Sequence, residues 1–262
     1  MILLKPVSFI GQWVIGWIQT LGKVAIFFFS AVAGIFQPRQ FPKIIQQLFY
    51  IGASSSLIIV LVGLFTGMVL GLQAYHALVK FGAGGAPGTL VGLALVKELG
   101  PVLTAIMITA RAGSAITAEI GIQRISEQID ALKTMHINPL RYLVSPRIAA
   151  SVVSFPILTA VFDLIGILGG YVAVVFLLNV TSNPYFYRME AGLELSDITE
   201  GFIKSLVFAL IVSTVCCYQG YNTHLRSDSH GAKAVGMATT AAVVLSCVLI
   251  LIADYIVTAI LI

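Results

Sequence analysis

The sequence predicts an all-α polytopic membrane protein, and two observations lead to this prediction. Hydrophobic residues make up 58% of the 262 residues and charged residues only 10%, whereas about 25% charged residues is usual in soluble proteins. The apolar residues also gather into long stretches with few charges, each able to cross a hydrocarbon core about 30 Å thick. A mean hydropathy of +1.00 agrees with this class.

The stretches with few charges indicate five membrane spans. The second span is interrupted by Lys97 and Glu98, and the third by Asp163. We expect the spans to cover residues 48–78, 88–117, 146–178, 203–225 and 234–260 of a single domain, residues 1–262.

Basic residues are concentrated in alternate connections between these spans. Residues 1–47 carry four of them and no acid, and the 119–147 and 218–234 connections add six more. The other two connections contain one basic residue each, Lys80 and Arg188. Because cytoplasmic loops carry the excess of lysine and arginine, we expect a cytoplasmic N-terminus and an external C-terminus. The net charge of +4 follows from loops that face anionic lipid and requires no nucleic-acid partner.

Residues 1–47 are expected to contain an amphipathic helix lying in the cytoplasmic membrane interface. Polar residues break the apolar run, and large apolar residues recur near helical spacing. This stripe consists of Phe9, Trp13, Trp17, Leu21 and Phe28. The alternative is a cleaved signal peptide, since AVA at 31–33 has the small-x-small form of a cleavage site.

The sequence contains no pattern typical of catalysis or of metal binding. Cys216, Cys217 and Cys247 all fall inside expected spans, and the four histidines form no metal-binding spacing. The glycine-rich stretch GAGGAPG at 82–88 lacks the lysine and the Ser/Thr of a phosphate-binding loop. We therefore expect no catalytic residue, no metal site and no nucleotide bound by this chain.

Glycines repeat every four residues along the first span. Gly63, Gly67 and Gly71 place three positions without side chains on one helix face, which allows another backbone to approach closely. Gly166 and Gly170 make the same spacing once in the third span. The partner helix lies either in this chain or in a second copy.

The pair Lys97 and Glu98 is the main candidate for a functional site. A charge at the centre of a membrane helix costs roughly 2.5–3.5 kcal/mol, so such residues are usually functional. Neighbours on a helix point about 100° apart, so each of the two needs its own partner. Pro101 lacks the N–H that would bond the carbonyl of Lys97, which leaves a free acceptor at that level. We expect a polar cavity partway across the membrane.

Other readings of the pair remain open. In a purely structural ion pair, Asp163 or Asp254 would supply a carboxylate to Lys97. A proton relay through Glu98 and Asp163 would instead indicate a proton-coupled secondary transporter, although no inverted repeat of spans is visible. A lipid-binding scaffold without transport is a third class.

The 118–139 connection is expected to form an amphipathic helix. Ile122, Ile125, Ile129, Leu132 and His136 share one stripe, and charged residues occupy the other faces. The helix either lies on the membrane or docks a cytoplasmic protein. Its three acids favour docking, because anionic headgroups repel them.

Three long motifs of this sequence resemble the MlaE-type permeases, which are membrane subunits of ABC systems that work with MCE proteins in lipid trafficking. They are GLFTGMVLGLQ at 63–73, KELGPVLTAIMITARAGSAITAEIG at 97–121 and SEQIDALKTMHINPLRYLVSPR at 126–147. With the length and the spans, the resemblance covers nearly the whole chain. Many members have arginine before ELGP, whereas this chain has Lys97, which keeps the charge but loses the bidentate grip on phosphate.

The resemblance implies a function and a set of partners. It implies a homodimeric permease in the bacterial inner membrane that moves phospholipid between the inner and outer membranes and maintains outer-membrane lipid asymmetry. The implied partners are a second copy of the chain, two copies of a cytoplasmic ATPase that binds ATP and Mg, and a periplasmic MCE ring. The 118–139 helix then looks like the coupling helix. This chain itself is expected not to be an enzyme.

Two groups of residues complete the expected sites. The pocket for the lipid would be formed by Lys97 and Glu98 with Leu70, Tyr75, Leu78, Phe81 and Leu99. Coupling to the ATPase would involve Glu119, Glu127 and Asp130.

Overall fold

The computed structural model describes residues 4–35, 40–80, 82, 87–178, 183–225 and 231–261, and of residues 4–14, 17, 183 and 184 only the backbone. In this part of the chain the regular structure is helical, and five segments are long and apolar enough to cross a membrane. They are Phe41–Val79, Pro87–Ile125, Leu140–Leu177, Leu195–Tyr221 and Ala232–Leu261. The prediction of an all-α multi-pass membrane protein with five spans is therefore confirmed.

Each of the first three spans consists of several helical pieces. The first is α2 (Phe41–Ile51), η2 (Ala53–Ser55) and α3 (Ser56–Val79). The second is α4 (Pro87–Ala94), η3 (Leu95–Leu99), α5 (Gly100–Ile108), η4 (Thr109–Gly113) and α6 (Ser114–Ile125). The third is η5 (Leu140–Val144), α8 (Ser145–Tyr171) and η6 (Val172–Leu177). The turns η3, η4, η5 and η6 are π-helical: Pro101 indicates the irregularity at η3, whereas no sequence pattern indicated the other three.

The last two spans are single helices, α10 (Leu195–Tyr221) and α11 (Ala232–Leu261). The fourth span begins at Leu195 rather than at the expected residue 203. A capping box fixes this start, because the N–H of Glu194 donates to Asp197 Oδ2 at 3.0 Å. The first turns of α10 therefore include acidic residues that we had assigned to an external loop.

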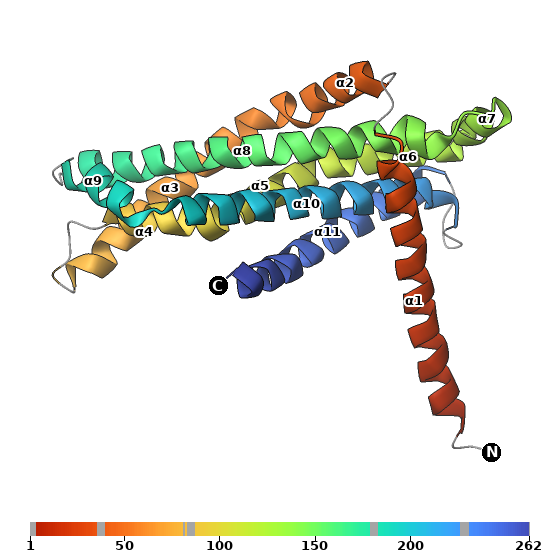
Figure 1. The fold of residues 1–262 in the computed structure, drawn as a ribbon, viewed down its shortest axis with the longest axis horizontal. Helices are drawn as coiled ribbons and strands as arrows, with labels where there is room; N and C mark the ends of the chain where they lie inside the picture. The colour runs from red at the N-terminus through yellow and green to blue at the C-terminus, as the bar shows by residue number, and fades with distance from the viewer. Residues whose placement is uncertain are drawn as a thin grey trace.

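Short helices lie at both ends of the bundle (Figure 1). One end carries α7 (Gln128–Thr134) and η7 (Thr223–Leu225), and the other carries α9 (Asn183–Gly192), which packs against α4. No pattern in the sequence predicted α9. Tyr185 fixes it to the third span by donating from its hydroxyl to the carbonyl of Ile167 at 3.1 Å.

The N-terminal helix α1 (Leu4–Val32) leaves the bundle at a steep angle, at the end where α7 lies (Figure 1). Its last turns are fixed to the bundle: Phe27 is buried against the rings of Tyr218 and Tyr221, and Ser145 donates a 2.5 Å hydrogen bond to the carbonyl of Ala31. The C-terminal end of α1 is thus packed into the bundle. Of the expected stripe, only Leu21 and Phe28 have described side chains.

The tightest contact in the bundle is the crossing of α3 and α8. A Cβ added at Gly63 would meet the carbonyl oxygen of Phe162 at 3.0 Å, and one at Gly71 would meet that of Gly170 at 2.9 Å. At Gly67 a Cβ would overlap the carbonyl of Gly166. The three glycines of the first span thus face the third span of the same chain, which answers the question of the partner helix.

Candidate functional site

Lys97 and Glu98 lie on the π-helical turn η3 in the second span. The turn precedes Gly100 and Pro101, and a proline at this position cannot donate to the carbonyl of Lys97. In the structure that carbonyl accepts a hydrogen bond of 2.8 Å from the ammonium group of Lys204 on α10. The backbone acceptor freed by the proline thus receives a side-chain donor from another helix.

The two charges take separate partners, as their neighbouring positions on a helix require. Lys97 Nζ lies 3.0 Å from Asp197 Oδ1 and 3.2 Å from Glu200 Oε2. Lys204 Nζ lies 2.8 Å from Glu98 Oε2, 3.4 Å from Asp254 Oδ1 and 3.6 Å from Glu200 Oε1. We call these six residues the ionic cluster: Lys97, Glu98, Asp197, Glu200, Lys204 and Asp254. It joins the second, fourth and fifth spans.

The partners of Lys97 differ from those we considered for a structural ion pair. Asp254 pairs with Lys204, and Asp163 on α8 faces Gly100 with its Oδ1 and makes no ion pair with Lys97. Asp163 Oδ1 is buried without a hydrogen-bond partner among the described residues. A proton relay between Glu98 and Asp163 therefore has no hydrogen bond to Asp163 Oδ1 among the described residues. Glu98 is instead paired with Lys204.

The ionic cluster is buried at its centre and open at its edge. The side chain of Lys204 is 0% exposed, whereas those of Lys97 and Glu98 are 32% and 42% exposed. Four carboxylates meet two ammonium groups among the described residues, so the cluster carries an excess of negative charge. The carboxylate of Glu98 also lies 3.5 Å from the hydroxyl of Thr258.

A cavity of about 440 Å³ opens beside the cluster. It is lined by Lys97, Glu194, Ser196, Asp197, Thr199, Glu200, Ile203 and Leu261. A polar cavity at the level of Lys97 is therefore present, with walls formed mainly by the first turns of α10.

The expected acyl-chain residues lie elsewhere. Leu70 and Leu99 are half-buried and pack against the apolar core, and Tyr75 contacts the ring of His76. Neither these residues nor the half-buried Leu78 line the cavity beside Lys97. Phe81 lies outside the described residues. The structure of the single chain therefore does not bring this apolar group together with the two charges.

The 118–139 region is two helices instead of one. Helix α6 continues the second span to Ile125, and α7 begins at Gln128. Between them Glu127 adopts a left-handed conformation with φ of 59°, which ends the first helix and turns the chain. The expected single stripe is broken accordingly: Ile129 is fully buried, while Ile122 is 57% exposed.

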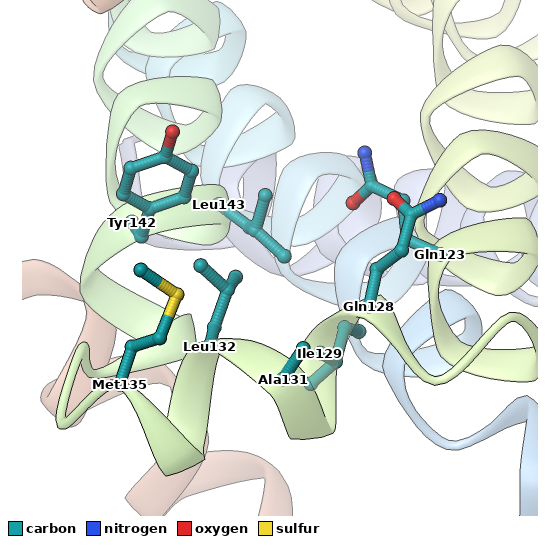
Figure 2. Close-up of a pocket in the computed structure, with 8 residues that line it drawn as sticks. All are labelled: Gln123, Gln128, Ile129, Ala131, Leu132, Met135, Tyr142 and Leu143. Carbon is teal, nitrogen blue, oxygen red and sulfur yellow. The ribbon is translucent and has the colours of Figure 1, made fainter.

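Helix α7 folds back toward the start of the third span and leaves a groove of about 420 Å³. Figure 2 shows Leu132 and Met135 on one side of this groove and Tyr142 and Leu143 on the other. Met135 is 67% exposed. The groove is an apolar feature at the end of the bundle where we expect a cytoplasmic partner.

The three coupling candidates occupy different settings at this end. Glu119 Oε2 lies 2.8 Å from the guanidinium of Arg147, which is buried. Asp130 Oδ1 accepts hydrogen bonds from Lys133 at 3.0 Å and from Arg124 at 2.8 Å, and these hold the pKa of Asp130 below its ordinary value. Glu127 is exposed at the break. Only Glu127 and Asp130 are therefore on the α7 side of the break, whereas Glu119 is part of the span.

Arg124 links α6 and α7 to the connection after α10. Its Nε donates to Nδ1 of His224 at 2.9 Å, which requires the neutral imidazole. Burial lowers the pKa of His224, and the nearby charge of Arg124 lowers it further. Two connections at this end are thus fixed to each other through one guanidinium group.

No expectation from the sequence included Lys204, the central member of the ionic cluster. The expected fourth span began at residue 203, so Lys204 lay at its edge, where a lone lysine usually faces water. Asp197 and Glu200 precede residue 203 and therefore fell in the external connection between the third and fourth spans. The available indication was the spacing of Glu200 and Lys204 by four residues, which places both on one helix face.

Known proteins are similar to this chain over nearly its whole length. The family described as Permease MlaE matches residues 44–260. The intermembrane phospholipid transport system permease protein MlaE of Haemophilus influenzae is 41% identical over 256 residues, 97% of this chain and 96% of that protein. A "probable ABC transporter permease protein" of Rickettsia typhi is 39% identical over 257 residues, 98% of this chain and 97% of its own. The chloroplastic protein TRIGALACTOSYLDIACYLGLYCEROL 1 of Arabidopsis thaliana is 34% identical over 212 residues, 81% of this chain and 59% of the plant protein.

Proposed function

This chain belongs to the MlaE permease family, and on that premise we propose that it is the membrane subunit of an ABC transporter that moves phospholipids between the inner and outer membranes. The observation that supports this most is the 41% identity to the Haemophilus protein, whose name states intermembrane phospholipid transport. The same role would maintain lipid asymmetry of the outer membrane. The ABC permease relatives give no support to a proton-coupled secondary transporter.

We propose that the ionic cluster marks the level of the lipid headgroup. Lys97 and Glu98 are charged, partly exposed and adjacent to a cavity, so a polar headgroup can reach them. A phosphate would approach the ammonium of Lys97 in competition with Asp197 and Glu200. Leu70, Tyr75, Leu78, Phe81 and Leu99 remain our candidates for acyl-chain contacts in the assembled transporter.

A second copy of the chain would complete this site. Helix α11 is the least buried of the five spans, since only 11% of its most apolar stretch is buried within the single chain. Its residue Leu261 lines the cavity beside Lys97, while Val244 and Leu251 are more than half exposed. A partner copy placed against α11 would bury these side chains and close the open side of the cavity.

The nucleotide chemistry would reside in the partners. We propose that two copies of a cytoplasmic ATPase bind ATP and Mg, that an MCE-domain ring sits on the periplasmic side, and that this chain is a transport subunit without catalysis of its own. The concentration of basic residues supports a cytoplasmic α7 end, with the N-terminus on that side and the C-terminus in the periplasm.

The test of this function is transport by the reconstituted complex. We expect phospholipid transfer that requires the separate ATPase and ATP and that persists without a proton gradient. Transfer driven by a gradient through this chain alone would instead establish a secondary transporter, and bound lipid that ATP does not move would establish a scaffold.

In the same preparations Lys97→Gln and Glu98→Gln should each retain less copurified phospholipid. Wild-type lipid content in both variants would remove the pair from the headgroup site.

The coupling role of α7 has its own test. Reversing the charge at Glu127 or Asp130 should weaken copurification of the ATPase by about tenfold or more, because like charges at an interface repel. Glu190→Lys is the matched control, since Glu190 is an exposed acid on α9 at the other end of the bundle. Retention of the ATPase by both reversed variants would exclude docking through these acids.

A further inference from the structure

A second polar cavity lies at the α7 end of the bundle, away from the ionic cluster. It has a volume of about 440 Å³ and lies between the start of α2 and the segment that follows α7. It is lined by Gln40, Lys43, His136, Ile137, Asn138, Arg141 and Tyr142. None of these seven residues is acidic, so the cavity differs in charge from the one beside Lys97.

The two cations of this cavity have no acidic partner among the described residues. Lys43 Nζ lies 3.0 Å from the ring centroid of Tyr142, and this contact holds the ammonium group at the cavity. Arg141 lies beside Tyr142 on η5, and its aliphatic stem packs against Gly34. Two positive charges thus border a space whose described lining residues offer them no counter-charge.

The cavity also contains a buried acceptor that lacks a donor. Gln40 is 7% exposed, and its amide nitrogen donates to the carbonyl of Arg141 at 2.6 Å. Because a carbonyl only accepts, this bond fixes the orientation of the amide. The other atom, Gln40 Oε1, is buried without a hydrogen-bond partner among the described residues. Buried polar atoms are normally paired, so this oxygen calls for a ligand with a hydroxyl or ammonium group.

The flanking surface is apolar and faces outward. Phe41, Ile45 and Phe49 recur every four residues on α2 and are 66%, 55% and 69% exposed. At about 100° per residue Lys43 points away from this stripe, so the cavity lies at the level where the apolar face of the first span begins, on another face of α2. A phospholipid suits this level, where headgroups meet acyl chains, whereas a free phosphate ion would gain nothing from the apolar span.

We propose that this cavity binds the headgroup of an anionic phospholipid of the cytoplasmic leaflet. Its phosphate lies between Lys43 and Arg141, and a hydroxyl of a glycerol headgroup donates to Gln40 Oε1. The acyl chains extend into the bilayer alongside the first span. Because the cavity joins α2 to the segment after α7, the lipid connects the start of the first span to the coupling end. This lipid is separate from the cargo proposed above, whose headgroup level lies at Lys97.

The experiment measures lipid binding to the purified transporter in neutral detergent, with phosphatidylglycerol, phosphatidylcholine and inorganic phosphate as three probes. We expect phosphatidylglycerol to bind most tightly. Lys43→Gln and Arg141→Gln should each weaken it by about fivefold, which corresponds to one charge at a membrane surface. Lys80→Gln is the control, because Lys80 is an exposed cation just after the other end of the first span.

Three outcomes would overturn the proposal. They are equal binding of phosphatidylglycerol and phosphatidylcholine, equal competition by inorganic phosphate, and unchanged binding in both variants relative to Lys80→Gln. Glutamine keeps the first methylenes of Arg141 that contact Gly34. If Arg141→Gln still fails to fold, Lys43→Gln decides the matter alone, since its loss leaves the Gln40 bond in place.

Discussion

Replacing Lys204 by methionine should destabilise the protein more than the loss of any exposed charge. Lys204 is fully buried and neutralises carboxylates from three spans, and its ammonium also satisfies the carbonyl of Lys97. Breaking a buried ion pair by removing one partner costs about 3–5 kcal/mol, because a charge is left without compensation. The half-exposed Glu98 will recover part of this through water, whereas Glu200 and Asp254 are more enclosed.

Thermal unfolding in detergent checks this prediction. We expect Lys204→Met to lower the melting temperature by about 10 °C, on the usual relation between free energy and melting temperature. Lys233→Met is the matched control, since Lys233 is an exposed lysine in the first turn of α11. Adding Asp254→Asn to Lys204→Met should restore part of the loss by removing an unpaired acid. If Lys204→Met melts no lower than Lys233→Met, the cluster does not hold these spans together.

Replacing Gly67 by alanine should be the most harmful of the conservative changes in the first span. A Cβ at this position would overlap the carbonyl of Gly166, and backbone on both sides cannot move aside as a flexible side chain would. Overpacking of this kind costs about 1–3 kcal/mol or more. At Gly63 and Gly71 the added carbon would meet backbone at 3.0 and 2.9 Å, so smaller losses are expected there.

The control for this series is Gly236→Ala on α11. A Cβ there meets nothing within 4 Å, and alanine favours a helix over glycine by about 0.8–1 kcal/mol. The two glycine-to-alanine changes should therefore shift the melting temperature in opposite directions. Equal melting temperatures for Gly67→Ala and Gly236→Ala would contradict the close crossing.

The sequence predicted the spans well because a membrane span requires a long apolar stretch, which is visible in the composition. A stretch of about 20 apolar residues has few alternatives to a transmembrane helix. The glycine spacing in the first and third spans also predicted a close crossing, since only residues without side chains allow it. The spacing alone left open whether the partner lay in the same chain, because that choice depends on how the spans are arranged.

The prediction was less accurate where charges lie inside the spans. Lys97 and Glu98 stood out, but their partners came from residues that also suited a water-exposed loop. A lysine at the edge of an apolar stretch looks the same whether it faces water or three carboxylates, so Lys204 was overlooked. The single helix expected over 118–139 was wrong for a local reason. Glu127 adopts a left-handed conformation that glutamate rarely takes, and no pattern of apolar residues shows it.

The backbone contact between α3 and α8 has a consequence for how such a transporter opens. Helices that meet through carbonyl groups and glycines cannot slide past each other without steric clash. We therefore expect the first and third spans to move together as one rigid unit. Helix α10 packs against α8, and α11 packs mainly against α10 and α6; together α10 and α11 carry four of the six residues of the ionic cluster. We therefore expect the lipid pathway to open when the fourth and fifth spans move relative to the first and third spans.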